Sequence, residues 1–185
     1  MKELFEAVRA GDLARVQTLV DADPTMAIFA AAILGDTSRL EELLAGNRSL
    51  VSAVSSDGWT PLHLAAFFGK GDAARLLLNK GASVTARSTN PMANTPLHAA
   101  AAGQHPELVK LLLDRGANAN AQQHGGWAPL HSAAQNGDLA SARALIDAGA
   151  DVSIRADNNQ KPLDMALTGA RQAMVEFLEA NGAKL

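Results

Sequence analysis

Residues 93–117 contain two short stretches in which apolar side chains recur with a helical period. In the first, Leu97, Ala100 and Ala101 lie at i, i+3 and i+4, on one face of a helix. In the second, residues 106–115, leucine and valine positions alternate with outward-facing charged positions such as Lys110. The pattern predicts two helices joined by a turn, and the small side chains of the first would let successive helices approach closely.

The ends of these helices carry residues that favour starting and stopping a helix. Thr95 stands where its hydroxyl can accept a hydrogen bond from a free helix N–H, and Pro96 occupies the first helical position. Gly116 suits the left-handed conformation that ends a helix. The residues after each second helix, such as 118–123, indicate a short extended arm leading to a turn.

The same unit recurs along the chain. TPLH occurs at 60–63 and 95–98, APLH at 128–131 and KPLD at 161–164, so the prolines are Pro61, Pro96, Pro129 and Pro162. A Gly-Ala pair follows each proline at a constant distance, beginning at Gly81, Gly116, Gly149 and Gly182. A period of roughly 33 residues predicts stacked supersecondary units.

These motifs resemble the ankyrin repeat, through TPLH followed by two alanines, the leucine-rich second helix and the closing Gly-Ala. The match is strong over 59–185 and looser over 1–58, where only the helix–turn–helix core remains. The resemblance implies an all-α solenoid of stacked helix–turn–helix pairs with short hairpin arms. Some stretches look like bacterial members of the family.

The resemblance also implies a single domain, 1–185, built from about six helix pairs. Its parts are an N-terminal cap, a degenerate repeat, three full repeats and a C-terminal capping repeat, over residues 1–23, 24–56, 57–91, 92–124, 125–157 and 158–185. We expect the last pair to cover the apolar face of the preceding one with Leu163, Ala166, Leu167, Val175 and Leu178.

Composition narrows the range of functions. The 185 residues are 48% apolar and carry a net charge of −3 with scattered Lys and Arg, so nothing indicates a nucleic-acid-binding surface. The absence of Cys excludes a disulfide framework, a thiolate zinc site and a Cys nucleophile. The first residues are charged rather than a secretory signal, and no stretch is apolar enough to span a membrane. We therefore expect a soluble, cytoplasmic monomer.

The histidine of TPLH is a candidate catalytic base or metal ligand, but it recurs. His63, His98 and His131 occupy the same position in three repeats, whereas an enzyme needs one base in one cleft. The resemblance implies that each histidine holds its turn by hydrogen bonds to Thr60 or Thr95 and to nearby backbone. It gives the glycines of the Gly-Ala pairs a structural role as well.

No other constellation predicts catalysis. His105 and His124 have no partner at a metal-ligand spacing, and the chain contains neither a phosphate-binding glycine loop nor a GxSxG motif. We expect no enzyme activity, no metal and no cofactor.

The resemblance implies that a partner binds in a concave groove lined by hairpin arms and first helices. Two kinds of position would point into it: the residue before each TPLH-like motif and the two residues after each alanine pair. The partner-binding residues predicted in this way, with the rim residue Asp57, are Trp59, Asn94, Trp127, Phe67, Phe68, Gln135, Asn136, Ile33 and Leu34. We expect Trp59, Phe67, Phe68 and Trp127 to form one partly exposed apolar face, as at an interaction hot spot.

Two alternatives stay open for these aromatic residues. Phe67 and Phe68 could pack as core between repeats, and each tryptophan could lie flat on its own hairpin. The arm between Gly81 and Thr95 is two residues longer than its successors. Insertions in solenoids often map to the binding face, but loops also tolerate insertions without any function.

The sequence thus predicts a protein–protein interaction module with an unidentified protein partner. An engineered ankyrin scaffold is one alternative, although the divergent second helices argue against consensus design. Binding of a small molecule in the groove is another, disfavoured by the lack of converging charged groups.

Overall fold

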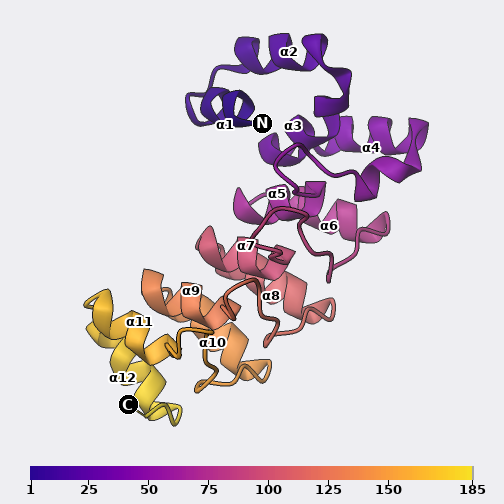
Figure 1. The fold of residues 1–185 in the computed structure, drawn as a ribbon. Helices are drawn as coiled ribbons and strands as arrows, with labels where there is room; N and C mark the ends of the chain where they lie inside the picture. Colours follow the sequence, from indigo (N-terminus) through magenta and orange to yellow (C-terminus); the bar gives the residue numbers. More distant parts are fainter. Residues whose placement is uncertain (185) are drawn as a thin grey trace.

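The computed structural model describes residues 1–184, which contain twelve α-helices, two short 3-10 helices and no strand (Figure 1). The α-helices are α1 (Lys2–Arg9), α2 (Leu13–Ala22), α3 (Ala27–Leu34), α4 (Thr37–Gly46), α5 (Pro61–Phe67), α6 (Gly71–Asn79), α7 (Pro96–Ala102), α8 (Pro106–Asp114), α9 (Pro129–Asn136), α10 (Leu139–Asp147), α11 (Pro162–Thr168) and α12 (Gln172–Ala180). The 3-10 helices η1 (Pro24–Met26) and η2 (Arg48–Ser52) lie in the connectors that follow α2 and α4. Successive helices form six pairs, which confirms the predicted all-α repeat fold. No helix in this range is long and apolar enough to cross a membrane.

The helix pairs stack in two layers (Figure 1). We call α3, α5, α7, α9 and α11 the inner layer, and they pack on one another in chain order. The outer layer consists of α4, α6, α8, α10 and α12, which pack on one another in the same order. The first pair, α1 and α2, packs against α3. The hairpin arms follow the outer helices and lead back to the inner layer.

The core runs along the stack because each repeat places leucine at the same two positions. These side chains have no exposed surface: Leu62, Leu97, Leu130 and Leu163 in the inner layer and Leu77, Leu112, Leu145 and Leu178 in the outer layer. Burying one such side chain contributes about 1.5–3 kcal/mol. The alanine pairs beside the inner leucines are equally buried, for example Ala100 and Ala101. Their small size lets α7 lie close to α5 and α9.

The Gly-Ala pairs end the outer helices in the left-handed conformation. Gly81, Gly116, Gly149 and Gly182 have φ values of 98°, 89°, 86° and 95°. No neighbouring atom would obstruct a Cβ at these positions, so glycine is favoured there by backbone conformation and not by space.

The hairpin arms are joined to one another by backbone hydrogen bonds. Thr89 N donates to Gly58 O at 2.9 Å, and Asp157 N donates to Gly125 O at 2.9 Å. The arms lie so close that a Cβ on Gly58 would be 2.4 Å from Asn90 N. Stacking of the repeats therefore continues through the arms as well as through the helices.

The last pair departs from the expectation at one residue. Leu163, Ala166, Val175 and Leu178 are buried as predicted, but Leu167 is 46% exposed. Leu167 is equivalent to Ala134, which is fully buried against the following pair. No helix pair packs on the far side of α11 in residues 1–184, so the prediction that Leu167 is buried is wrong.

Candidate functional site

The three repeat histidines join each repeat to the next one. In each case the imidazole Nε2 lies about 3 Å from a backbone carbonyl of the following repeat: 3.0 Å from His63 to Asn94, 3.0 Å from His98 to Trp127 and 3.1 Å from His131 to Gln160. Each of these carbonyls also accepts the N–H that closes its own hairpin, as Trp127 O does from Gln123 N. Both acceptor sites of the oxygen are thus occupied.

This geometry fixes the tautomer of the histidines. A carbonyl can only accept, so Nε2 carries the proton and Nδ1 is the acceptor. At His63, Nδ1 lies 2.8 Å from the Thr60 hydroxyl, which donates to it, and Thr95 and His98 have the same arrangement. In the third repeat Ala128 has no hydroxyl, and its backbone N–H donates to His131 Nδ1 at 3.0 Å.

Burial keeps these imidazoles neutral. Desolvation lowers the pKa of His63 from 6.5 to about 4, against an opposing effect of its hydrogen bond to Asn94. Desolvation likewise lowers the pKa of His98 to about 4, and it lowers the pKa of His131. The exposed fractions of the three residues are 0%, 3% and 2%. Both ring nitrogens of each histidine are hydrogen-bonded within the protein, so their chemistry serves the fold.

Replacing His98 by Ala is expected to lower the free energy of unfolding by about 1–3 kcal/mol, because Thr95 and Trp127 each lose a buried hydrogen-bond partner. Urea unfolding at pH 7 measures the change, with the exposed His124→Ala as a control that should differ by less than about 0.5 kcal/mol. Equal stability of the His98 variant and the wild type would show that the histidine does not hold the repeats together.

Four aromatic rings meet at the N-terminal half of the inner layer. Trp59 and Phe67 have ring centroids 5.4 Å apart, Phe67 and Phe68 5.3 Å, and Phe68 and Phe5 5.6 Å. We call Phe5, Trp59, Phe67 and Phe68 the aromatic cluster. All four are partly buried and pack against the core. Each of these rings is thus partly in the core between repeats and partly on the surface. The two interpretations of Phe67 and Phe68, packing as core and binding a partner, therefore do not exclude each other.

Trp127 lies apart from this cluster. Its ring makes an edge contact with His131 of its own repeat, with centroids 5.1 Å apart, and no ring pair links it to the cluster among the described residues. The indole also covers its own hairpin, because a Cβ on Gly125 would lie 3.0 Å from it. The four residues thus form two groups of rings, and their sharing of one partly exposed apolar face stays a prediction. The small residues of α7 and its C-terminal turn separate α5 from α9.

Trp127 instead lines a separate hollow of about 270 Å³, the Trp127 hollow. Its lining residues come from two arms and two inner helices: Met92, Gln123, Trp127, His131, Ser132, Gln135 and Met165. Met92 belongs to the long arm and is 47% exposed. Its carbonyl accepts a hydrogen bond from His124 N at 2.8 Å, which holds the arm against the next hairpin.

Hydrogen bonds hold the long arm against the hairpins on both sides of it. Asn90 Nδ2 donates to Asp57 O of the preceding hairpin at 3.1 Å. Arg87 Nη1 donates to Ala93 O within the arm and to Gln122 O of the next repeat, each at 3.0 Å. The extra residues therefore fill the space between neighbouring hairpins and present Met92 beside Trp127.

Two predicted partner-binding residues are buried instead. Ile33 has no exposed surface, because it lies on α3, against which the first helix pair packs. Asn94 is 8% exposed, because the long arm turns back on it and Ser88 Oγ accepts its N–H at 3.0 Å. The assignment of these two residues to a binding surface is wrong. Leu34 and Asn136 are partly buried, and Asp57 and Gln135 are exposed.

Sequence reasoning did not assign six residues of these surfaces to partner binding: Phe5 in the aromatic cluster, and Met92, Gln123, His131, Ser132 and Met165 around the hollow. Phe5 reaches Phe68 from the first helix pair, where the motifs that set the register are absent. Met92 lies in the insertion, and Met165 directly follows KPLD, the degenerate copy of the TPLH motif. The recurring position after each TPLH-like motif could have indicated Met165, since Ser132 of the same hollow is its equivalent. No cluster of three potential metal ligands occurs in residues 1–184.

Comparisons with known proteins agree with this architecture. The family model described as ankyrin repeats (3 copies) matches residues 4–88 and 97–185. A curated relative, Ankyrin repeat and SAM domain-containing protein 6 of Rattus norvegicus, is 35% identical over 98 residues, which are 48% of this chain and 11% of that protein. The chain thus matches only about a tenth of the length of this relative. Because the family model covers nearly the whole stack, the chain belongs to the ankyrin-repeat family.

Proposed function

We propose that this chain is a protein–protein interaction module that binds a partner protein on its inner layer, at the aromatic cluster and the Trp127 hollow. Ankyrin repeats are in general protein–protein interaction modules. The observation that carries the more specific proposal is that the two tryptophans of the chain both lie, partly exposed, on the inner-layer side.

The size and chemistry of these surfaces support a protein partner. Partly exposed aromatic side chains among polar neighbours are typical of interaction hot spots. The Trp127 hollow, at about 270 Å³, falls below the roughly 300–1,000 Å³ of pockets that enclose a drug-sized ligand. It is better suited to one or two side chains of a protein. Met92 and Met165 at its edge are flexible side chains that can adapt to such an anchor.

An enzymatic role has less support. The three repeat histidines are buried and neutral, and each already has two hydrogen-bond partners. A general base must lie within hydrogen-bond reach of the proton that it removes. Both ring nitrogens of these histidines are already used within the fold, so we propose binding without catalysis.

Trp59→Ala and Trp127→Ala are each expected to weaken the partner's binding by about 2 kcal/mol or more, roughly 30-fold in Kd. The cost in stability should differ, because Trp59 packs on Phe67 and such a ring pair is worth about 0.5–1.5 kcal/mol. Trp127 packs outside the core, on His131 of its own repeat, so its variant should lose less, about 0.5 kcal/mol, the low end of that range.

Affinity capture from the source cells, followed by titration of the captured protein, tests this proposal. The matched control is Arg75→Ala, an exposed side chain on α6 in the outer layer. A partner that binds both tryptophan variants as tightly as wild type, at equal folded concentration, would contradict the proposal.

A further inference from the structure

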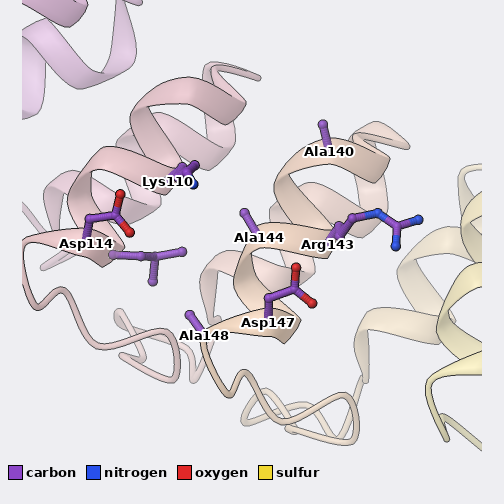
Figure 2. Close-up of a pocket in the computed structure, with 8 residues that line it drawn as sticks. Lys110, Asp114, Ala140, Arg143, Ala144, Asp147 and Ala148 are labelled. Atoms are coloured by element: carbon purple, nitrogen blue, oxygen red, sulfur yellow. The ribbon is translucent and has the colours of Figure 1, made fainter.

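Two hollows, one on each layer, differ in their chemistry. The larger one, of about 540 Å³, lies in the outer layer between α8 and α10 (Figure 2), and its charged lining residues are Lys110, Asp114, Arg143 and Asp147. The Trp127 hollow is lined within residues 1–184 by uncharged side chains, and two of them are methionines, Met92 and Met165. Thioether sulfur is therefore concentrated at the proposed binding surface.

Met92 is the most exposed of the five methionines of the chain. It is 47% exposed, whereas Met174 is 1% exposed. Met1, Met26 and Met165 are partly buried and pack against the core. A dissolved oxidant reaches sulfur where the side chain is exposed, and the chain has no cysteine to compete for it. Met92 is thus the sulfur that an oxidant meets first.

The backbone of Met92 is fixed although its side chain lies outside the core. Met92 N donates to Asn90 Oδ1 at 3.0 Å, and Met92 O accepts from His124 N at 2.8 Å. Both backbone polar groups are therefore paired within the arms. A chemical change at the sulfur leaves these hydrogen bonds and the buried leucines of the stack in place.

We propose that Met92 is a redox-sensitive modification site, where oxidation by hydrogen peroxide to the sulfoxide weakens binding of the partner protein at the Trp127 hollow. Met92 Sδ attacks one peroxide oxygen, the O–O bond breaks, and the second oxygen leaves as water with both protons. The sulfur loses two electrons, and the peroxide gains them. A methionine sulfoxide reductase reverses the change: two thiols become a disulfide, and the sulfoxide oxygen leaves as water.

The sulfoxide changes what the hollow can accommodate. A thioether is flexible and apolar and can contact an aromatic or aliphatic anchor, whereas a sulfoxide is polar. An apolar anchor that covers the sulfoxide oxygen removes water from it without supplying a hydrogen bond, which costs binding free energy. This inference rests on the proposed function, because it requires the partner's anchor to occupy the Trp127 hollow. The order in which the methionines oxidise does not require a partner.

Peptide mapping of the full chain tests the modification site by itself. The chain is treated with dilute hydrogen peroxide at pH 7, and mass spectrometry follows each methionine with time. Met92 should oxidise at least about tenfold faster than the buried Met174, and before Met26 and Met165. The chain oxidised at Met92 should melt within about 2 °C of the reduced chain. Oxidation of Met92 no faster than that of Met174 would overturn the proposal.

Titration of the partner protein obtained by affinity capture tests the effect on binding. Wild type and Met92→Leu are each measured reduced and oxidised, and each is compared with its own reduced form. Oxidation should weaken binding by wild type about fivefold or more, and binding by Met92→Leu less than about twofold, because leucine has no sulfur. Methionine sulfoxide reductase with a thiol reductant should restore binding by wild type. Equal weakening of the two chains would overturn the role of Met92.

Trp127→Ala separates a failure of this inference from a failure of the proposed function. A partner that needs Trp127 but binds the chain oxidised at Met92 as tightly as the reduced chain would overturn the redox effect alone. A partner that binds Trp127→Ala as tightly as wild type would overturn both the hollow as a binding site and its control by oxidation.

Discussion

Acidification from pH 7 to pH 4 is expected to lower the free energy of unfolding by about 3 kcal/mol for each of His63 and His98. Both have a pKa lowered from 6.5 to about 4 by burial. Between these values the unfolded chain binds a proton that the folded chain does not, so falling pH favours unfolding. The stabilisation is fully present above pH 6.5 and is lost as the pH falls through 4. His131 adds to the effect in the same direction.

Urea unfolding at pH 7, 6, 5 and 4 measures this loss. Each histidine contributes a slope of about 1.4 kcal/mol per pH unit within the window, against a total stability of about 5–15 kcal/mol for a typical domain. The double variant His63→Gln with His98→Gln should be less stable at pH 7 and show a shallower decline. A stability that is flat from pH 7 to pH 4.5 would contradict the structural role of the histidines. NMR signals of the His63 and His98 imidazoles that titrate near pH 6.5 would contradict it as well.

Deletion of residues 162–185, which contain α11 and α12, should make the chain unfold at markedly lower denaturant or aggregate. The deletion removes the buried Leu163 and Leu178, and it exposes Ala134 and Leu145 of the preceding pair, both with no exposed surface in the full chain. In a stack of repeats, stability is approximately the sum of the repeats and of their interfaces. The loss should therefore exceed that of any single core substitution.

Two point variants of α11 provide a matched comparison for the deletion. Leu163→Ala removes a fully buried side chain and should cost about 2–5 kcal/mol. Leu167→Ala removes a side chain that is 46% exposed and should change stability by about 0.5 kcal/mol or less. Urea midpoints and light scattering measure all three variants. A truncated chain that is monodisperse and as stable as the full chain would show that the last pair does not protect the stack.

The repeat register allowed much of the fold to be predicted. The spacing of prolines and Gly-Ala pairs placed every helix pair from α5 onward, because a position within one repeat has the same backbone environment in the next. The register also indicated that His63, His98 and His131 share one role. It did not indicate that Nε2 of each histidine bonds to the following repeat, since that partner lies 29–31 residues away in the sequence.

The register could not show what covers a given position. Ile33 and Phe67 are equivalent, but the N-terminal helix pair packs on α3 and buries Ile33, while Phe67 stays partly exposed. Asn94 is buried by the insertion that precedes it, although its equivalents Trp59 and Trp127 are partly exposed. Exposure in both cases depends on neighbours outside the repeat pattern, which tertiary packing alone determines.

Site-specific photo-cross-linking tests most directly whether the inner layer is the binding surface. A benzophenone amino acid replaces Phe68 in the aromatic cluster, Gln135 beside the Trp127 hollow, or Arg75 on the outer layer, and the full chain is irradiated with the partner. The account predicts cross-links to the same partner from positions 68 and 135 and none from position 75. Cross-links from position 75, with none from either inner-layer position, would contradict it.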